Sequence, residues 1–148
     1  MKLYDHPLSG NGYKVRLLLA HLGTPYEYVP VDLLAGEARS DAFRRRNPLG
    51  KVPVLELDDG RYLPESNAIL FWLARGTPYW PQDVFDQALA MKWLFFEQRS
   101  HLPTVGGARF LLKFMSGGPT PIDQNELRRM QEGGRTALEV MEQHLADA

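Results

Sequence analysis

The chain of 148 residues contains no cysteine. This absence excludes disulfide bonds, catalysis by a protein thiolate and zinc sites that use cysteine ligands. Histidine is scarce as well, and His6, His21, His101 and His144 show no spacing of the His-x-x-x-His kind. The sequence therefore predicts no structural metal site.

An excess of charge of one sign is also missing, because 17 Lys and Arg residues face 18 Asp and Glu residues. This balance argues against a nucleic-acid partner and against strong attraction to a membrane. The short basic run Arg44–Arg46 is expected to be solvated surface, as most such runs are. The apolar stretches are too short to span a membrane, and the N-terminus has no signal-peptide pattern. We expect a soluble, cytoplasmic protein.

What is present is a βαβα pattern followed by a ββα pattern, within a composition of 44% apolar residues that fits one domain or two small ones. Turn and helix-stop signals at Gly23, Asn47-Pro48 and Asp58–Gly60 separate the elements. We expect the first two strands to be parallel and the hairpin to be antiparallel. The expected strands are 2–5, 25–33, 52–57 and 61–65, and the expected helices are 10–22, 37–45 and 66–75.

The helix that follows the hairpin should begin at Ser66 as its N-cap. It should place Ile69, Trp72 and Leu73 on its inner face.

The second half of the chain is helical in pattern. The stretch 77–83 carries two prolines and no periodicity, and it reads as a linker between a domain over 1–76 and a helical domain over 84–148. One long helix is expected from about residue 85 to 115, with a kink at Pro103. After a loop at 116–121, Asp123-x-x-Glu126 opens a second helix. Its predicted apolar row is Leu127, Met130, Leu138, Met141 and Leu145.

Three motifs carry a resemblance to a known family: Ser9–Arg16, Asn47–Leu55 and Glu65–Ile69. In this order and spacing they resemble the cytosolic glutathione transferases over residues 1–115, and the remainder more loosely. The resemblance implies a thioredoxin-like α/β N-terminal domain with a mixed four-stranded sheet, followed by an all-α C-terminal domain. Compared with family members the helical domain looks truncated to two long helices. We therefore expect exposed apolar helical surface and association, as a homodimer.

The first motif is interpreted as a site for the glutathione thiol. The resemblance places the catalytic hydroxyl at Ser9, and Asn11 can donate from its amide to the same sulfur. A helix N-terminus and a hydroxyl donor both interact better with S⁻ than with SH, and therefore lower a thiol pKa from about 8.5. The alternative for Ser9 is a helix N-cap and nothing more. The Asn11-Gly12 pair is similar to bacterial members associated with disulfide-bond reductase activity.

The second motif is interpreted as an edge that pairs with the peptide backbone of glutathione. The resemblance implies a cis bond between Val52 and Pro53, which would turn the backbone groups of Val52 outward like an added strand. The alternative is an ordinary edge-strand proline. Lys51 either meets the glycyl carboxylate or is simply exposed.

The third motif is interpreted as the site for the γ-glutamyl end. Glu65 can pair with the ammonium and Ser66, at a helix N-terminus, can hold the carboxylate. The alternatives are a solvated acid and a plain N-cap. The resemblance also places Gln98, His101 and Arg109 near a second-substrate pocket, although a histidine of this kind is more often a surface or packing residue.

The leading interpretation is a glutathione transferase that conjugates glutathione to a small electrophile or uses it to reduce a disulfide or peroxide. Glutathione is then a co-substrate, and neither a cofactor nor a metal is expected. The first alternative is a non-catalytic glutathione-binding or protein-interaction module, because fold does not fix function. A second alternative is a truncated homologue without measurable activity.

Overall fold

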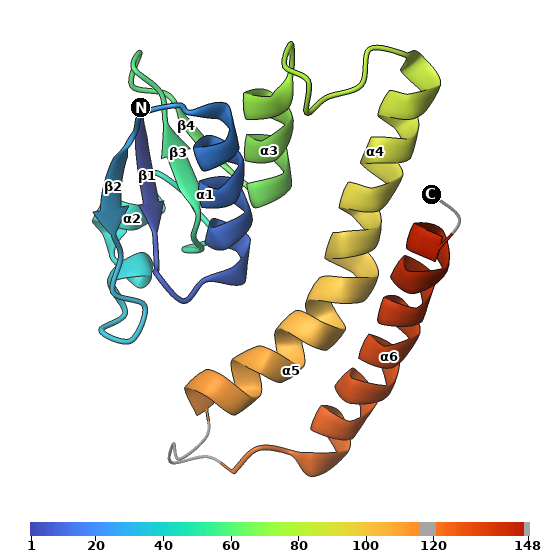
Figure 1. Cartoon of the computed structure of the whole chain (residues 1–148). Coiled ribbons are helices and arrows are strands. Elements are labelled where there is room, and N and C mark those ends of the chain that lie inside the picture. The colour runs from blue at the N-terminus through green and yellow to red at the C-terminus, as the bar shows by residue number, and fades with distance from the viewer. Residues whose placement is uncertain (116–120, 147–148) are drawn as a thin grey trace. The chain divides into compact units, whose positions relative to one another are not determined.

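A computed structural model of the whole chain describes residues 1–115 and 121–146 (Figure 1). The chain forms two compact units, Met1–Pro81 and Gln82–Ala148. The loop that the sequence predicts at 116–121 lies outside the described residues except for Pro121.

The first unit is built on one mixed sheet with the strand order β2-β1-β3-β4. β1 pairs in parallel with β2 and antiparallel with β3, and β3 pairs antiparallel with β4. The predicted thioredoxin-like arrangement is confirmed. The strands are β1 (Lys2–Asp5), β2 (Glu27–Pro30), β3 (Val54–Glu56) and β4 (Tyr62–Pro64).

β3 starts two residues later than the sequence predicts, at Val54 rather than Val52. Pro53 precedes it and has no N–H to give to a neighbouring strand. The residues before Val54 therefore remain outside the sheet ladder.

Two helices, α1 (Gly10–Leu22) and α3 (Ser66–Ala74), cover one face of this sheet (Figure 1). The core between sheet and helices consists of buried aliphatic side chains from α1, α3, β1 and β3. Its buried members are Leu3, Val15, Leu19, Leu55, Ile69 and Leu73.

One prediction for α3 is wrong. Ile69 and Leu73 are buried, but Trp72 is 45% exposed. The buried row runs Ser66, Ile69, Leu73, at i, i+3 and i+7, and this row leaves Trp72 on the flank of the helix.

The opposite face of the sheet is covered by two short helices instead of the single helix predicted over 37–45. They are η1 (Glu37–Arg39), a 3₁₀ turn, and α2 (Asp41–Arg44). Ser40 separates them because its backbone is extended and its hydroxyl accepts the N–H of Phe43 at 3.2 Å, which begins a new helix.

Arg46, the last residue of the basic run, packs on this same face and is half-buried, so the expectation that the whole run is solvated is wrong. Its guanidinium lies 4.7 Å from the centre of the Tyr4 ring and 5.9 Å from that of Tyr62. The Tyr4 hydroxyl donates to Glu56 Oε2 at 2.5 Å. Burial raises the pKa of Tyr4 and the bond to Glu56 raises it further, whereas the charge of Arg46 opposes the shift.

The residues after α3 remain part of the first unit as far as Pro81. Trp80 is buried, and its ring lies 4.9 Å from that of Phe71 in an edge-on contact. The backbone N–H of Thr77 donates to Ala74 O at 3.0 Å, which turns the chain at the end of α3.

The second unit is helical, as the sequence predicts. A continuous helical segment runs from residue 84 to 115, but two stretches have the wider π-helical turn, one of which contains Pro103. The sequence pattern did not predict these turns. The elements are α4 (Val84–Phe96), η2 (Glu97–Gly106), α5 (Gly107–Phe110), η3 (Leu111–Met115) and α6 (Gln124–Ala146).

α6 begins where the sequence predicts, since the Asp123 carboxylate accepts the N–H groups of Asn125 and Glu126 at 2.8 and 3.3 Å. It packs closely along η2 at two glycines. A Cβ built on Gly133 would lie 2.9 Å from Cγ2 of Thr104, and one on Gly134 would lie 3.2 Å from Cγ2 of Val105.

The predicted apolar row of α6 is therefore only partly right. Leu127 is buried, but Leu138 and Leu145 are 49% and 66% exposed. The contact with η2 uses Gly134 and Ala137 because small residues let two helices approach. Leu138 and Leu145 remain largely exposed.

Candidate functional site

Ser9 stands at the N-terminus of α1 with an extended backbone. Its Oγ accepts the N–H of Gly12 at 3.0 Å, and its carbonyl accepts the N–H of Tyr13 at 2.9 Å. The side chain is thus an N-cap, as one interpretation of the sequence held. Accepting a hydrogen bond does not consume the hydroxyl hydrogen, so the cap leaves Ser9 able to donate to an anion.

The loop that carries Ser9 is fastened by a residue pair that the sequence analysis did not single out. Asp5, at the end of β1, is fully buried and forms an ion pair with Arg16 of α1. Arg16 also donates from Nη2 to the carbonyl of Pro7 at 3.1 Å. The sequence offered one signal for this ion pair, which is a charged residue at the end of a strand followed by an Arg within the first helix.

The first and third motifs meet in the structure. Ser66 Oγ donates to Asn11 Oδ1 at 3.4 Å, across 55 residues of sequence. Ser66 is 3% exposed and Asn11 is half-buried. The N-terminal turns of α1 and α3 are therefore adjacent, and both direct their backbone N–H groups toward that end of the unit.

The N-cap of α3 is Glu65 and not Ser66, so the prediction that Ser66 caps this helix is wrong. Ser66 is the first helical residue, and the carbonyl of Glu65 accepts the N–H of Ile69 at 2.9 Å. The backbone of Glu65 has φ 70° and ψ 111°. Among the residues that the structure describes, Glu65 is the one non-glycine residue with a positive φ. Its side chain is exposed.

The second motif contains the expected cis peptide bond between Val52 and Pro53. Pro53 is buried, Val52 is half-buried and Lys51 is exposed. This exposure of Lys51 is compatible with both interpretations given to it above.

A buried asparagine supports that segment. Asn47 is 3% exposed, its amide Nδ2 donates to the carbonyl of Lys51 at 2.8 Å, and its Oδ1 accepts the N–H of Leu49 at 3.1 Å. Gly50, at φ 61°, completes the turn, and a Cβ there would lie 2.7 Å from the carbonyl oxygen of Ala38. Sequence patterns marked Asn47 as part of a helix stop and of the second motif, and they did not indicate this supporting role.

The three residues proposed for a second-substrate pocket belong to the second unit. Gln98 and His101 are half-buried within η2, and Arg109 is exposed on α5. Gln98 Nε2 donates to Glu97 Oε2 at 3.1 Å.

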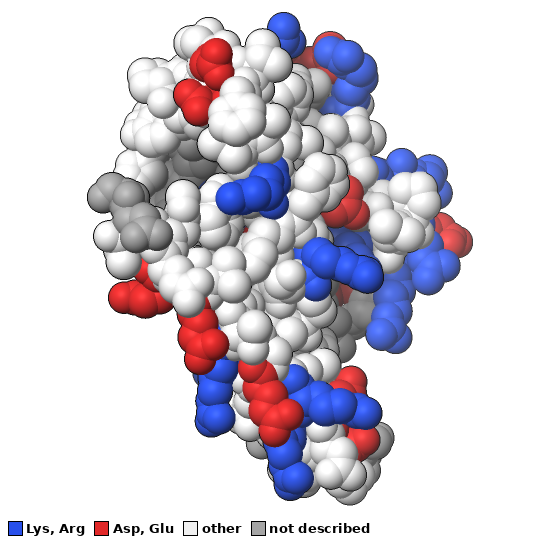
Figure 2. Space-filling model, turned by 90° about the vertical axis from the view of Figure 1, so that its right-hand side faces the viewer, with Lys and Arg blue, Asp and Glu red and all other residues white. Residues whose placement is uncertain are grey.

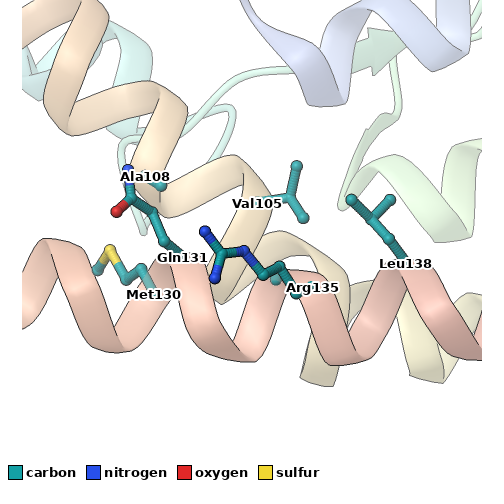
Figure 3. Close-up of a pocket in the computed structure, with 7 residues that line it drawn as sticks. Val105, Ala108, Met130, Gln131, Arg135 and Leu138 are labelled. Carbon is teal, nitrogen blue, oxygen red and sulfur yellow. The ribbon is translucent and has the colours of Figure 1, made fainter.

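None of these three lines the groove of about 290 Å³ between the η2–α5 segment and α6 (Figure 3). In Figure 3 the side chains of Gln131 and Arg135 rise from α6 at this groove. The other residues that line the groove are Val105, Ala108, Met130, Gly134 and Leu138.

Charges of both signs are distributed over the face shown in Figure 2, with uncharged side chains between them. Within 1–115 and 121–146, no three His, Asp or Glu side chains gather as a metal site would require. No helix in those ranges is long and apolar enough to cross a bilayer.

Three comparisons relate this geometry to known proteins. The family model for the glutathione S-transferase N-terminal domain matches residues 1–75. The crystal structure of a "possible glutathione S-transferase" from Rhodopseudomonas palustris has 49% sequence identity and a TM-score of 0.92, covering 98% of this chain and 65% of that chain. Ure2p in complex with glutathione has 32% identity and a TM-score of 0.87, covering 99% of this chain and 68% of that one.

Among curated proteins, the transcriptional regulator URE2 of Saccharomyces cerevisiae is 36% identical over 124 residues, which is 77% of this chain and 35% of that protein. The chain spans half or less of the length of the curated relatives it matches.

Proposed function

This chain belongs to the glutathione S-transferase family, and from that membership we propose that it binds glutathione and stabilises its thiolate for attack on an electrophile or a disulfide. The observation that carries the proposal is the contact between Asn11 and Ser66. It joins the helix end assigned to the thiol with the helix end assigned to the γ-glutamyl group, as a ligand only three residues long requires.

In the proposed complex Ser9 donates its hydroxyl hydrogen to the glutathione sulfur. The N–H of Gly12 already donates to Oγ, and this polarises the hydroxyl and makes it a better donor. With the Asn11 amide as a second donor and the N-terminus of α1 behind both, the thiol pKa falls by about one to two units. Each unit corresponds to about 1.36 kcal/mol in favour of the thiolate.

The remaining contacts orient the tripeptide. The backbone of Val52, before cis-Pro53, pairs with the cysteinyl residue as an added strand. The Glu65 carboxylate pairs with the γ-glutamyl ammonium, and Ser66 with the N-terminus of α3 holds the carboxylate. Lys51, which is exposed, is placed against the glycyl carboxylate.

The chemical step then needs no covalent change in the protein. The thiolate sulfur forms a bond to an electrophilic carbon and the leaving group departs with its electron pair, or it attacks a disulfide and releases one thiolate from it. Holding both reactants together lowers the entropic part of the barrier. We propose Gln98, His101 and Arg109 as contacts to the second reactant.

A second candidate is a glutathione-binding module without catalysis. Its support is the 36% identity to a protein whose name is transcriptional regulator, together with the solved complex of Ure2p with glutathione. Ser9 and Asn11 favour the enzyme, because a module that only retains glutathione has no need of thiol-activating donors.

We also propose that the chain acts as a homodimer. Phe71 and Trp72 are 40% and 45% exposed on α3, which leaves aromatic surface uncovered on the first unit. Sedimentation velocity tests this: a dimer is expected, and a monomer at all concentrations contradicts the proposal.

The test of function is a calorimetric titration with glutathione, followed by thiolate absorbance of the bound peptide against pH. Binding with a lowered thiol pKa, and turnover of a chloronitrobenzene or a small disulfide, supports the enzyme. Binding with the pKa of free glutathione supports the module. If calorimetry detects no binding at millimolar glutathione, both proposals fail.

A further inference from the structure

Two side-chain hydrogen bonds join the N-terminal half of α1 to the first turn of α3. One is the 3.4 Å bond from Ser66 to Asn11. The other runs from Lys14 Nζ to Asn67 Oδ1 at 2.7 Å, across 53 residues of sequence. Asn11 and Lys14 are three residues apart and lie on one face of α1, and their partners are consecutive on α3.

The two bonds differ in strength. The Lys14 bond is short and has a charged donor, and such bonds are about twice as strong as neutral ones. The Ser66 bond is neutral, and at 3.4 Å it is long for an O–H donor. The Lys14–Asn67 pair is therefore the stronger of these two links between the helix ends.

The two bonds also respond differently to a ligand. A serine hydroxyl has one hydrogen to donate. If the proposed function holds, the γ-glutamyl carboxylate accepts that hydrogen from Ser66, and the bond to Asn11 is then lost. Asn67 keeps its bond from Lys14, because the ligand contacts assigned above use neither of these two residues.

We propose that Lys14 is a positioning residue that acts through Asn67: it keeps the N-terminus of α3 against the N-terminus of α1 while glutathione is bound. This inference rests on the proposed glutathione site. Its consequence is selectivity, because the register of α3 matters only to a ligand that reaches Ser66. A thiol peptide that lacks the γ-glutamyl group gains nothing from the pair.

The test compares glutathione with cysteinylglycine, which lacks the γ-glutamyl group, by calorimetry on the full chain. Lys14→Met and Asn67→Leu should each weaken glutathione binding about tenfold and leave cysteinylglycine binding within about twofold. The double variant should be no weaker than the single ones, because both remove the same bond. Lys14→Arg keeps the charge and the donor and should retain most of the affinity.

The matched control is Lys2→Met. Lys2 is a surface lysine of the same unit and pairs with Glu27 at 3.7 Å. The Lys2→Met substitution removes one positive charge from the same unit at a different place, and we expect its glutathione affinity to lie within about twofold of that of the parent chain. Melting temperatures verify that each variant is folded, and if Asn67→Leu fails to fold, the Lys14→Met and Lys14→Arg pair decides alone.

Two results would overturn the inference while leaving the proposed function intact. In one, the parent chain binds glutathione and Lys14→Met binds it equally well. In the other, Lys14→Met weakens both ligands by the same factor, which indicates a general structural or electrostatic effect. Failure of the parent chain to bind glutathione instead counts against the proposed function itself.

Discussion

The hydroxyl oxygen of Ser9 accepts the backbone N–H of Gly12 at 3.0 Å, so a single side chain caps α1 and presents an O–H group at its N-terminus. The two interpretations of Ser9 drawn from the sequence are therefore compatible. They differ in what a substitution does to a bound thiol.

Replacing Ser9 by Ala should lower the free energy of unfolding by about 1 kcal/mol through loss of the cap. It should also raise the pKa of the bound glutathione thiol by about one unit, because a donor to the thiolate is lost. Denaturant unfolding and thiolate absorbance measure the two effects. Ser40→Ala is the matched control, since Ser40 caps α2 through Phe43 in the same way, and it should change stability alone. Equal pKa values of the bound thiol in the two variants would show that Ser9 only caps α1 and does not donate to the thiolate.

Asn47→Ala should be more damaging than its position in a loop suggests. It removes two hydrogen bonds inside a buried site and leaves the Lys51 carbonyl and the Leu49 N–H without that partner. We expect a loss of about 2 to 3 kcal/mol in unfolding free energy and weaker glutathione binding, because the turn before Val52 is no longer held. Asn125→Ala, at an exposed position of α6, is the control. Unchanged affinity in Asn47→Ala would show that the turn holds its shape without this side chain.

The order of elements could be predicted from the sequence because it rests on local patterns, whereas the meeting of the motifs was implied only by the family resemblance. Alternation and turn residues define the strands, and Gly23 at φ 61° ends α1 where the pattern indicates. The cis bond before Pro53 followed from family resemblance and not from local propensity.

Other features depend on contacts between distant residues and could not be predicted in this way. The rings of Tyr4 and Tyr62, which belong to two different strands, pack against the Arg46 guanidinium and partly bury it. The buried row of α6 includes Gly134 and Ala137, because α6 uses its small residues where it packs against η2. Hydrophobic periodicity weights large side chains, and it therefore predicted Leu138 instead.

Gly133→Ala should destabilise the second unit, although alanine favours a helix over glycine by up to about 1 kcal/mol. The new methyl would lie 2.9 Å from Cγ2 of Thr104, closer than packed carbon atoms come. Thr104→Ser removes that methyl and keeps the hydroxyl that donates to Ser100 O. The double variant should therefore recover most of the loss in thermal unfolding. A Gly133→Ala variant more stable than the parent would contradict the close approach of the two segments.

Tyr4 should make the fold sensitive to alkali. Its pKa is raised in the folded chain, first by burial and then by its bond to Glu56. The folded state therefore retains this proton at a pH at which the unfolded chain loses it. The resulting stability is fully present below about pH 10 and is lost as the pH rises above that value. In Tyr4→Phe the unfolding free energy should fall less steeply between about pH 9 and pH 11. Tyr13→Phe, at a side chain that is 59% exposed, should retain the slope of the parent chain.

Substitutions at Glu65 test whether the strained backbone of this residue is kept because its carboxylate binds glutathione. A non-glycine residue at φ 70° destabilises the folded state by on the order of 1 to 3 kcal/mol. Glycine removes this strain, but part of the gain in stability is offset because glycine gives the unfolded chain more conformational entropy. Glu65→Gly should therefore be more stable than the parent by about 1 kcal/mol and should bind glutathione at least tenfold more weakly, because the ammonium loses its partner. Glu65→Gln keeps the strained backbone and loses only the charge, so it should bind as weakly without any gain in stability. Chemical unfolding and calorimetry on the two variants separate backbone from charge. A Glu65→Gln chain that binds glutathione like the parent would mean that the carboxylate does not meet the ammonium, and the strain would then need another explanation.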